Sequence, residues 1–202
     1  MTEHLAMRVI GAAFDSPDEM IKLVRAEPHL LEARTGLGET PLHYLVVENQ
    51  LRAVVLLVEV GASINTVSSV GATPLSEAAS LGYTEMVEFL LSRGAELKLS
   101  QQHEPVLHEA VRSANPQVVT LILSAGAPID EQGELNETAL HLASESDDRL
   151  SMLEVLIEAG ANLAIRAAFE ETALDVALRE GANECACALV AAGAPRFRTS
   201  AV

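Results

Sequence analysis

The sequence predicts an all-α repeat protein in which short helix pairs recur along the chain. A four-residue element, Thr-Pro-Leu-His in its first copy, comes back four times at spacings of 32 to 34 residues, and a Gly-Ala pair keeps the same interval. Thr followed by Pro starts a helix and Gly ends one, so each interval is expected to hold two antiparallel helices. The copies of the element lie at residues 40–43, 73–76, 105–108, 138–141 and 172–175.

A period near 33 residues that carries this element resembles the ankyrin-repeat family, and the resemblance covers nearly the whole chain. It implies a curved solenoid of about six helix-turn-helix repeats joined by short hairpin-like loops. The concave side would consist of the first helices and the loop tips. It also implies a single domain over residues 1–202, because each repeat buries its apolar face by stacking on its neighbours. The expected repeats are 1–34 as a cap, 35–67, 68–99, 100–132, 133–166, and 167–202 as the second cap.

The first two repeats show the expected helix boundaries. In residues 1–34, Pro17 suits the first position of the second helix. Pro28 ends that helix, since the residue before a proline avoids the α region. In the second repeat, Thr40 is the expected N-cap and Gly61 the expected C-terminal stop. The third repeat follows the family pattern most closely.

The last three repeats depart from this pattern. The fourth lacks one residue and has Pro105 where Thr is expected, which predicts an irregular loop before its first helix. The fifth carries one extra residue, which predicts a longer turn at residues 145–149. Asn136 can adopt the left-handed conformation of the Gly that it replaces. Glu170 replaces the same Gly in the last repeat, which puts a tight turn there in doubt.

The charge balance restricts the class of partner. Acidic residues outnumber basic ones 29 to 13, and the formal net charge is −16. Binding to nucleic-acid phosphates depends on Lys and Arg, so nucleic acid and anionic membranes are disfavoured and a basic protein is favoured. The charge could equally serve solubility alone. Neither a signal peptide nor an apolar run of about 18 residues is recognised, so no membrane partner is expected.

No catalytic, cofactor-binding or metal site is expected. Cys185 and Cys187 would point to different faces of a helix, which argues against a disulfide or a metal pair and for a reducing, cytoplasmic location. His43, His108 and His141 recur at one position of the repeat, which indicates a structural role. The family resemblance implies that this histidine ties neighbouring loops together by hydrogen bonds.

The loop tips and the inner face of the first helices are expected to hold the binding surface, as the resemblance implies. The position three residues before the motif Thr is apolar in four of five repeats. Exposed apolar residues in one column can mark an interface, although they could also pack on adjacent loops. Acidic residues dominate the neighbouring positions. The predicted partner-binding residues are Leu37, Glu39, Tyr44, Val70, Leu81, Glu104, Arg112, Glu134, Leu135, Glu137, Phe169, Glu170, Glu171 and Arg179.

These features predict a monomeric protein–protein interaction module that is not an enzyme and binds a protein with a basic patch. It would act as a scaffold, a regulator or an inhibitor. An antitoxin-like inhibitor of a basic toxin and a secreted effector that captures a host protein are both open within this class. A self-associating structural element is the alternative, because the apolar tips could pair with a second copy.

Overall fold

A computed structural model describes residues 2–100 and 102–195 of the chain. These residues form two compact units, one ending at His103 and the other starting at Glu104. Within the described residues, twelve α-helices and three 3-10 helices occur and no strand, which confirms the predicted all-α repeat fold. No helix in these ranges is both long enough and apolar enough to cross a bilayer. The single domain over residues 1–202 stays a prediction.

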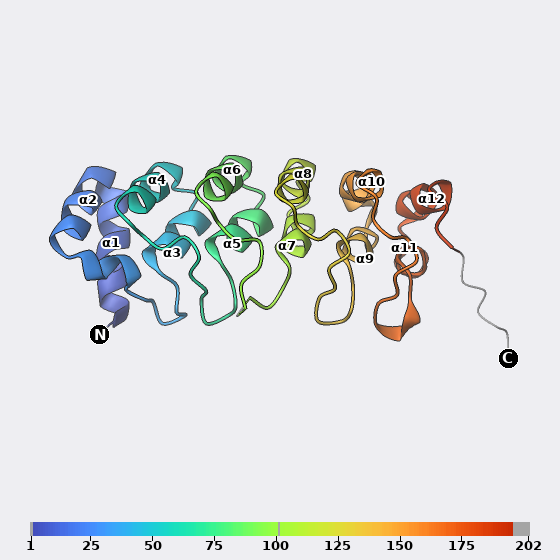
Figure 1. Ribbon diagram of the computed structural model, residues 1–202, viewed down its shortest axis with the longest axis horizontal. Coiled ribbons are helices and arrows are strands. Elements are labelled where there is room, and N and C mark those ends of the chain that lie inside the picture. The colour runs from blue at the N-terminus through green and yellow to red at the C-terminus, as the bar shows by residue number, and fades with distance from the viewer. Residues whose placement is uncertain (1, 101, 196–202) are drawn as a thin grey trace. The chain divides into compact units, whose positions relative to one another are not determined.

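The first unit consists of three helix pairs. Helices α1, α3 and α5 pack in series and form one layer, while α2, α4 and α6 form the other (Figure 1). Each first helix also packs against the second helix of its own pair. The helices are α1 (Thr2–Asp15), α2 (Pro17–Ala26), η1 (Pro28–Glu32), α3 (Pro41–Val47), α4 (Leu51–Glu59), α5 (Pro74–Ser80) and α6 (Thr84–Ser92).

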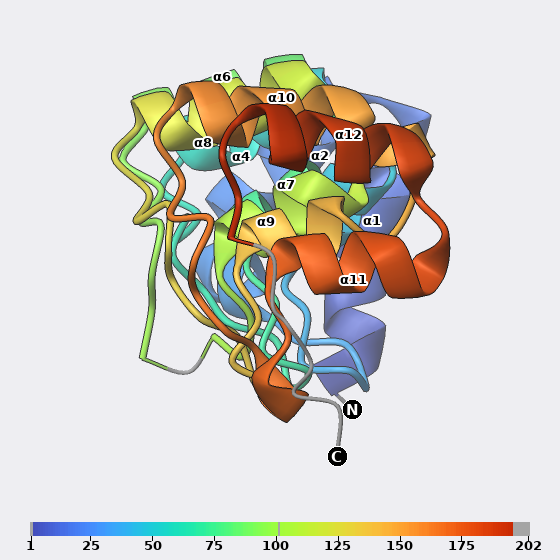
Figure 2. The same ribbon diagram turned by 90° about the vertical axis from the view of Figure 1, so that its right-hand side faces the viewer.

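The second unit repeats this arrangement. Helices α7, α9 and α11 form its first layer, and α8, α10 and α12 form its second. Viewed along the unit, the loops lie on the side of the first layer that faces away from the second (Figure 2). The helices are α7 (Val106–Arg112), α8 (Pro116–Ser124), α9 (Ala139–Ala143), η2 (Asp147–Arg149), α10 (Leu150–Glu158), η3 (Ala168–Glu170), α11 (Ala173–Glu180) and α12 (Asn183–Ala191).

The core between the two layers follows the helical spacing of apolar residues. In α3, Leu42, Leu45 and Val46 are buried at positions i, i+3 and i+4, which lie on one face of a helix. In α4, Val54 and Leu57 are buried in the same way. Full burial of each of these side chains contributes about 1.5–3 kcal/mol, so the packing of the two layers supplies most of the stability of such short helices.

A reciprocal set of hydrogen bonds starts most of the first helices. The side chain three residues after the motif Thr accepts a hydrogen bond from the backbone N–H of that Thr. His43 Nδ1 accepts from Thr40 at 3.2 Å, and Ser76 Oγ accepts from Thr73 at 2.8 Å. The same bond occurs before α9 and α11. Helix α7 lacks it, because Pro105 stands where Thr is expected and has no N–H.

The recurring histidines also connect neighbouring loops. Nε2 of His43 lies 3.3 Å from the carbonyl oxygen of Ala72, and Nε2 of His141 lies 3.2 Å from that of Glu171. Both rings are buried, and burial lowers the pKa of His43 to about 4 and lowers the pKa of His141. Each ring is therefore neutral at pH 7, with Nδ1 accepting and Nε2 donating. The structural role predicted for this position is confirmed for His43 and His141.

Four hairpin loops close with the same pair of backbone hydrogen bonds. In the first, Thr35 N–H donates to Glu39 O at 2.9 Å and Gly38 N–H donates to Thr35 O at 3.0 Å. Asn136 occupies the Gly position of a later loop with φ 57°, as predicted. The tight turn doubted at Glu170 does form, because Phe169 and Glu170 both adopt positive φ, at 64° and 61°.

The turn between α9 and α10 is longer than the equivalent turns of the other repeats, as predicted from the extra residue of the fifth repeat, and it contains η2. The carboxylate of Asp147 in this turn accepts a hydrogen bond from the backbone N–H of Cys185 at 3.0 Å. Cys185 is the third residue of α12, whose own N-cap residue, Ala182, offers no side-chain hydrogen bond. The inserted turn of one repeat therefore caps the second helix of the next, where the helix dipole also favours a carboxylate.

Glu77 on α5 makes stability depend on pH. Its Oε2 is buried and accepts no hydrogen bond from the described residues. Burial, and then repulsion by Glu39, raise the pKa of Glu77 from 4.5 to about 8. Because the folded chain keeps this proton where the unfolded chain loses it, the stability contributed by Glu77 is complete below about pH 4.5 and is lost as the pH rises through about 8.

We expect Glu77→Gln to remove this pH dependence. The urea midpoint of the wild type should fall between about pH 6 and about pH 9, and the midpoint of Glu77→Gln should fall much less. Glu85→Gln, which makes the same change at an exposed site on α6, serves as the control and should behave as the wild type. An equal fall in Glu77→Gln and the wild type would contradict the assignment.

The turn at Glu170 predicts a stabilising substitution. Glu170→Gly should raise the free energy of unfolding by about 1 kcal/mol, because a left-handed conformation costs a residue with a Cβ about that much. The Arg166–Glu170 ion pair that is lost is exposed and contributes little. Glu134→Gly, at a tip position without positive φ, should instead destabilise the chain. Urea unfolding of both variants tests the pair, and destabilisation by Glu170→Gly would contradict the prediction.

Candidate functional site

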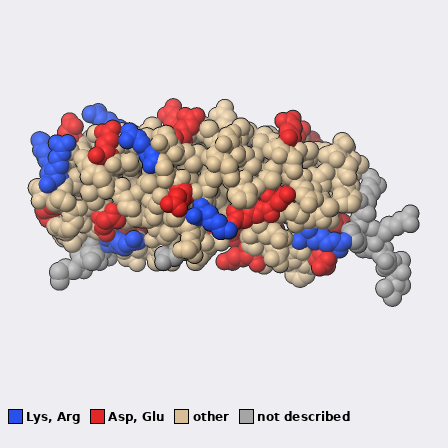
Figure 3. Space-filling model, viewed as in Figure 1, with Lys and Arg blue, Asp and Glu red and all other residues tan. Residues whose placement is uncertain are grey.

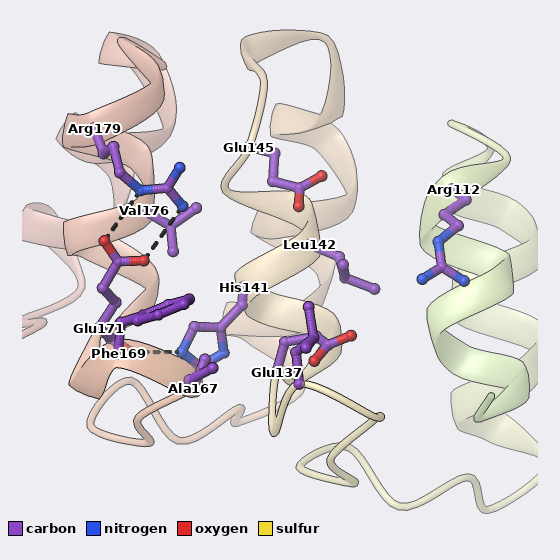
Figure 4. Close-up of a pocket in the computed structure, with 12 residues that line it drawn as sticks. Arg112, Glu137, His141, Leu142, Glu145, Ala167, Phe169, Glu171, Val176 and Arg179 are labelled. Carbon is purple, nitrogen blue, oxygen red and sulfur yellow. Dashed lines mark hydrogen bonds and ion pairs between the residues drawn. The ribbon is translucent and has the colours of Figure 1, made fainter. Parts of the chain in front are cut away.

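The second unit contains a pocket of about 320 Å³ between the loop tips and the first helices. Leu135 and Phe169, from two successive tips, form part of its lining together with Leu142 of α9 and Val176 of α11. The two tip side chains are 64% and 92% exposed, so little of their apolar surface is covered by the fold. The pocket therefore has an apolar side, which includes the exposed Phe169, next to charged residues (Figure 4).

The repeat register explains why these side chains meet. Leu142 and Val176 each lie four residues after the motif Thr of their repeat, and Arg112, Glu145 and Arg179 each lie seven residues after it or after its substitute. Equivalent positions of stacked repeats lie side by side, so the pocket carries a column of apolar residues next to a column of alternating charge.

Ion pairs hold the charged side chains around the pocket. Arg179 donates to both carboxylate oxygens of Glu171, from Nε at 3.0 Å and from Nη2 at 3.3 Å, and it also contacts Glu180. Arg112 pairs with Glu109 at 2.8 Å. Arg179 and Glu171 lie at one end of the pocket, and Arg112 faces the others from the opposite end (Figure 4). Two-point binding fixes the plane of the Arg179 guanidinium.

The histidine of the pocket lining is engaged at both ring nitrogens. His141 is the lining residue that most often serves as a general base in other proteins. Its Nδ1 accepts the Thr138 N–H at 3.1 Å and its Nε2 lies 3.2 Å from Glu171 O. Because both nitrogens are engaged and the ring is buried, His141 cannot exchange a proton with a molecule in the pocket without breaking the loop connection.

The structure brings together six of the fourteen predicted partner-binding residues. These six line the pocket, and they are Arg112, Leu135, Glu137, Phe169, Glu171 and Arg179. Three more belong to the same unit outside the lining: Glu104 is half-buried beside His108, whereas Glu134 and Glu170 are exposed.

The other five predicted residues belong to the first unit. Its two apolar tips, Leu37 and Val70, are both 60% exposed, and Leu81 is exposed as well. Tyr44 is half-buried, and the carboxylate of Glu39 accepts a hydrogen bond from the Thr35 hydroxyl at 3.1 Å. The exposure of all four apolar tips favours the interface interpretation over packing on neighbouring loops.

Six of the twelve lining residues are absent from the prediction, namely His141, Leu142, Glu145, Ala167, Ala168 and Val176. For Leu142 and Val176 the sequence contained a signal. Tyr44, which was predicted, lies four residues after its motif Thr, and both of these missed residues share that register. Ala167 and Ala168 line the pocket because of the way the last hairpin turns at Phe169 and Glu170. The conformational preferences of these residue types alone do not predict that turn.

The arginines of the second unit all lie beside acidic residues, which outnumber them. Residues 104–195 contain sixteen acidic residues and four arginines, and every one of these arginines forms an ion pair. On the face drawn in Figure 3, basic groups lie close to acidic ones and most of the surface carries neither. Acidic residues are therefore in excess over basic ones in this unit, but Arg112 and Arg179 make the electrostatic potential near the pocket less negative.

Comparison with known proteins agrees with this architecture. The family model described as ankyrin repeats, in three copies, matches residues 9–101 and 107–197. Ankyrin repeat protein nuc-2 of Neurospora crassa is 29% identical over 169 residues, which are 83% of this chain and 16% of that protein. Human ankyrin repeat and SOCS box protein 16 is 31% identical over 141 residues, 69% of this chain and 31% of that protein.

Human SMC5-SMC6 complex localization factor protein 1 is 36% identical over 95 residues, 46% of this chain and 9% of that protein. The chain spans less than a third of the length of each of these three relatives, so the comparison concerns their repeat segments. Because the family model matches far more than half of the sequence, the chain belongs to the ankyrin-repeat family.

Proposed function

We propose that this chain is a protein-binding module without catalytic activity, and that the pocket of its second unit receives an apolar side chain of the partner. Ankyrin repeats are generally protein–protein interaction modules. The observation that carries the proposal is the 92% exposure of Phe169 at a pocket. Aromatic residues dominate the binding energy of interfaces, and clustered exposed apolar residues mark them.

The partner is a protein with basic residues around an apolar anchor. Sixteen acidic residues against four arginines leave residues 104–195 with a negative excess, which attracts positive charge and repels phosphates. Nucleic acids and anionic membranes are disfavoured as partners for the same reason. Within the pocket, the exposed carboxylate of Glu145 is placed to receive a Lys or Arg that flanks the anchor.

The proposed mode of action is that of a monomeric scaffold, regulator or inhibitor in the cytoplasm. One relative is named as a localization factor of a complex, which is consistent with recruitment by such a repeat segment. A binding surface made of a hairpin tip and a helix face can block a partner or hold it in place without any chemical step. A toxin inhibitor and a secreted effector both fall within this mode.

The tips can be tested by capture from a native lysate. The wild type is compared with Leu135→Asp/Phe169→Asp in the second unit and with Leu37→Asp/Val70→Asp in the first. We expect mass spectrometry to identify a protein that the wild type retains and the Leu135/Phe169 variant loses, because a carboxylate at the anchor opposes burial. Val190→Asp, a matched change on an exposed residue of α12, should retain the partner.

Equal capture by the wild type and both tip variants would refute the proposed site. Loss only in the Leu37/Val70 variant would assign binding to the first unit instead. If the chain captures only itself and its mass rises with concentration in sedimentation, the self-associating alternative replaces the proposal.

The charge component makes a separate prediction. Glu134→Lys/Glu170→Lys should slow association with the captured partner about tenfold at low salt and weaken its dependence on salt, since steering acts on the association rate. Glu154→Lys/Glu158→Lys on α10 makes the same charge change in the second layer and should have a smaller effect. Surface plasmon resonance at two salt concentrations measures both rates. An unchanged association rate would exclude steering while leaving the apolar anchor intact.

A further inference from the structure

His108 differs from the two other histidines of its register. Nδ1 of His43 and of His141 accepts the N–H of the motif Thr, but Pro105 has neither an N–H nor a hydroxyl to offer. Nδ1 of His108 instead lies 3.3 Å from Oε2 of Glu104. With Pro105 in place of Thr, Nδ1 of His108 therefore lies beside the Glu104 carboxylate instead of a backbone N–H donor.

The protonation of His108 is fixed from the other side of the ring. Its Nε2 lies 3.0 Å from the carbonyl oxygen of Glu131, which accepts a hydrogen bond and therefore requires Nε2 to carry the proton. Nδ1 then presents a lone pair toward the lone pairs of Glu104. Two acceptors at this distance repel each other unless a cation lies between them, and a ring held this way is the usual arrangement of a metal-binding histidine.

A third ligand comes from the next hairpin loop. Carboxylate oxygens of Glu104 and Glu137 and a ring nitrogen of His108 all lie within 4.8 Å of one another. Oε2 of Glu137 is buried and accepts no hydrogen bond from any residue that the structure describes. Burying a carboxylate oxygen without a hydrogen-bond donor costs free energy, and a bound cation would offset that cost. Glu137 Oε2 is therefore a second, independent indication of a cation at this position.

The space between the three side chains is kept open by Gly133. A Cβ at this position would lie 2.8 Å from Glu104 Oε2, 3.0 Å from His108 Nδ1 and 3.1 Å from Glu137 Oε1. The 3.3 Å between the first two ligand atoms fits the edge of a tetrahedron with bonds of about 2.1 Å, which is about 3.4 Å.

We propose that Glu104, His108 and Glu137 bind a divalent transition-metal ion such as Zn²⁺. One imidazole and two carboxylates suit Zn²⁺, Mn²⁺ or Fe²⁺, and three protein ligands leave a coordination position for water. The ion would join the loop before α7 to the loop before α9. It would act next to Pro105, which lacks the N–H that forms a hydrogen bond at the start of α3, α5, α9 and α11. The sequence predicts no such site, because its three ligands are dispersed over two repeats and the cluster contains a single histidine.

The test is titration of the metal-stripped full chain with Zn²⁺ by calorimetry, in a Cys187→Ser background that removes an exposed thiol. We expect one ion per chain and a rise in melting temperature with Zn²⁺. Glu137→Gln should weaken binding by more than about tenfold. Glu134→Gln, which removes the same charge from an exposed position of the same loop, should bind Zn²⁺ as the wild type does.

Pro105→Thr separates loss of the site from loss of the fold. It should restore the Thr–His bond to Nδ1, raise the melting temperature of the metal-free chain, and still weaken Zn²⁺ binding by more than about tenfold. Circular dichroism checks that each variant is folded. Absence of stoichiometric Zn²⁺ binding to the wild type, or equal affinity in the wild type, Glu137→Gln and Pro105→Thr, would overturn the proposal.

Discussion

In each unit, a recurring buried histidine satisfies two backbone groups in different repeats and so connects neighbouring helix pairs. In its regular form, the imidazole takes the first free N–H of its own helix with Nδ1 and reaches a carbonyl of the adjoining loop with Nε2, as His43 and His141 do. Helix starts and loop positions are thereby coupled, and burial of the ring keeps water from competing for either bond. Where Ser76 or Asp175 stands instead, the helix start is retained and the bond to the next loop must come from elsewhere.

The hairpins are held by backbone hydrogen bonds and by the buried histidine rings, so the side chains at the loop tips are not needed to maintain the fold. The backbone of Ser69 donates to Leu37 O at 3.1 Å and that of Ala168 donates to Leu135 O at 2.8 Å, so successive tips are joined through peptide groups whatever side chains they carry. Leu135 and Phe169 can then expose apolar surface without loss of the fold. Because backbone groups maintain the loops and the side chains form the exposed surface, one architecture can carry many different binding surfaces.

Much of the architecture was predictable from the sequence because its determinants are local. Spacing and turn residues placed the helix pairs, the left-handed Asn136 and the longer turn of the fifth repeat. Other features depend on contacts between repeats. The doubt about Glu170 was misplaced because the surrounding loop imposes a positive φ that its side chain does not favour. The approach of Glu137 to His108 was missed because it follows from the register of two loops and from the absence of a side chain at Gly133. The pocket was half anticipated, since its tip residues were recognised but Leu142 and Val176 were not.

The cap that Asp147 provides to α12 has a consequence for how such a chain can evolve. Repeat arrays are thought of as interchangeable modules that grow or shrink by duplication and deletion of whole copies. Here the turn containing the extra residue supplies a hydrogen-bond acceptor to a helix that belongs to the following copy. Excision of the fifth copy would leave the last one without its acceptor, and duplication of the last copy alone would produce a helix without a matching turn. The fifth and sixth copies are therefore coupled by this hydrogen bond, and deletion of the fifth copy alone would remove a cap from the sixth.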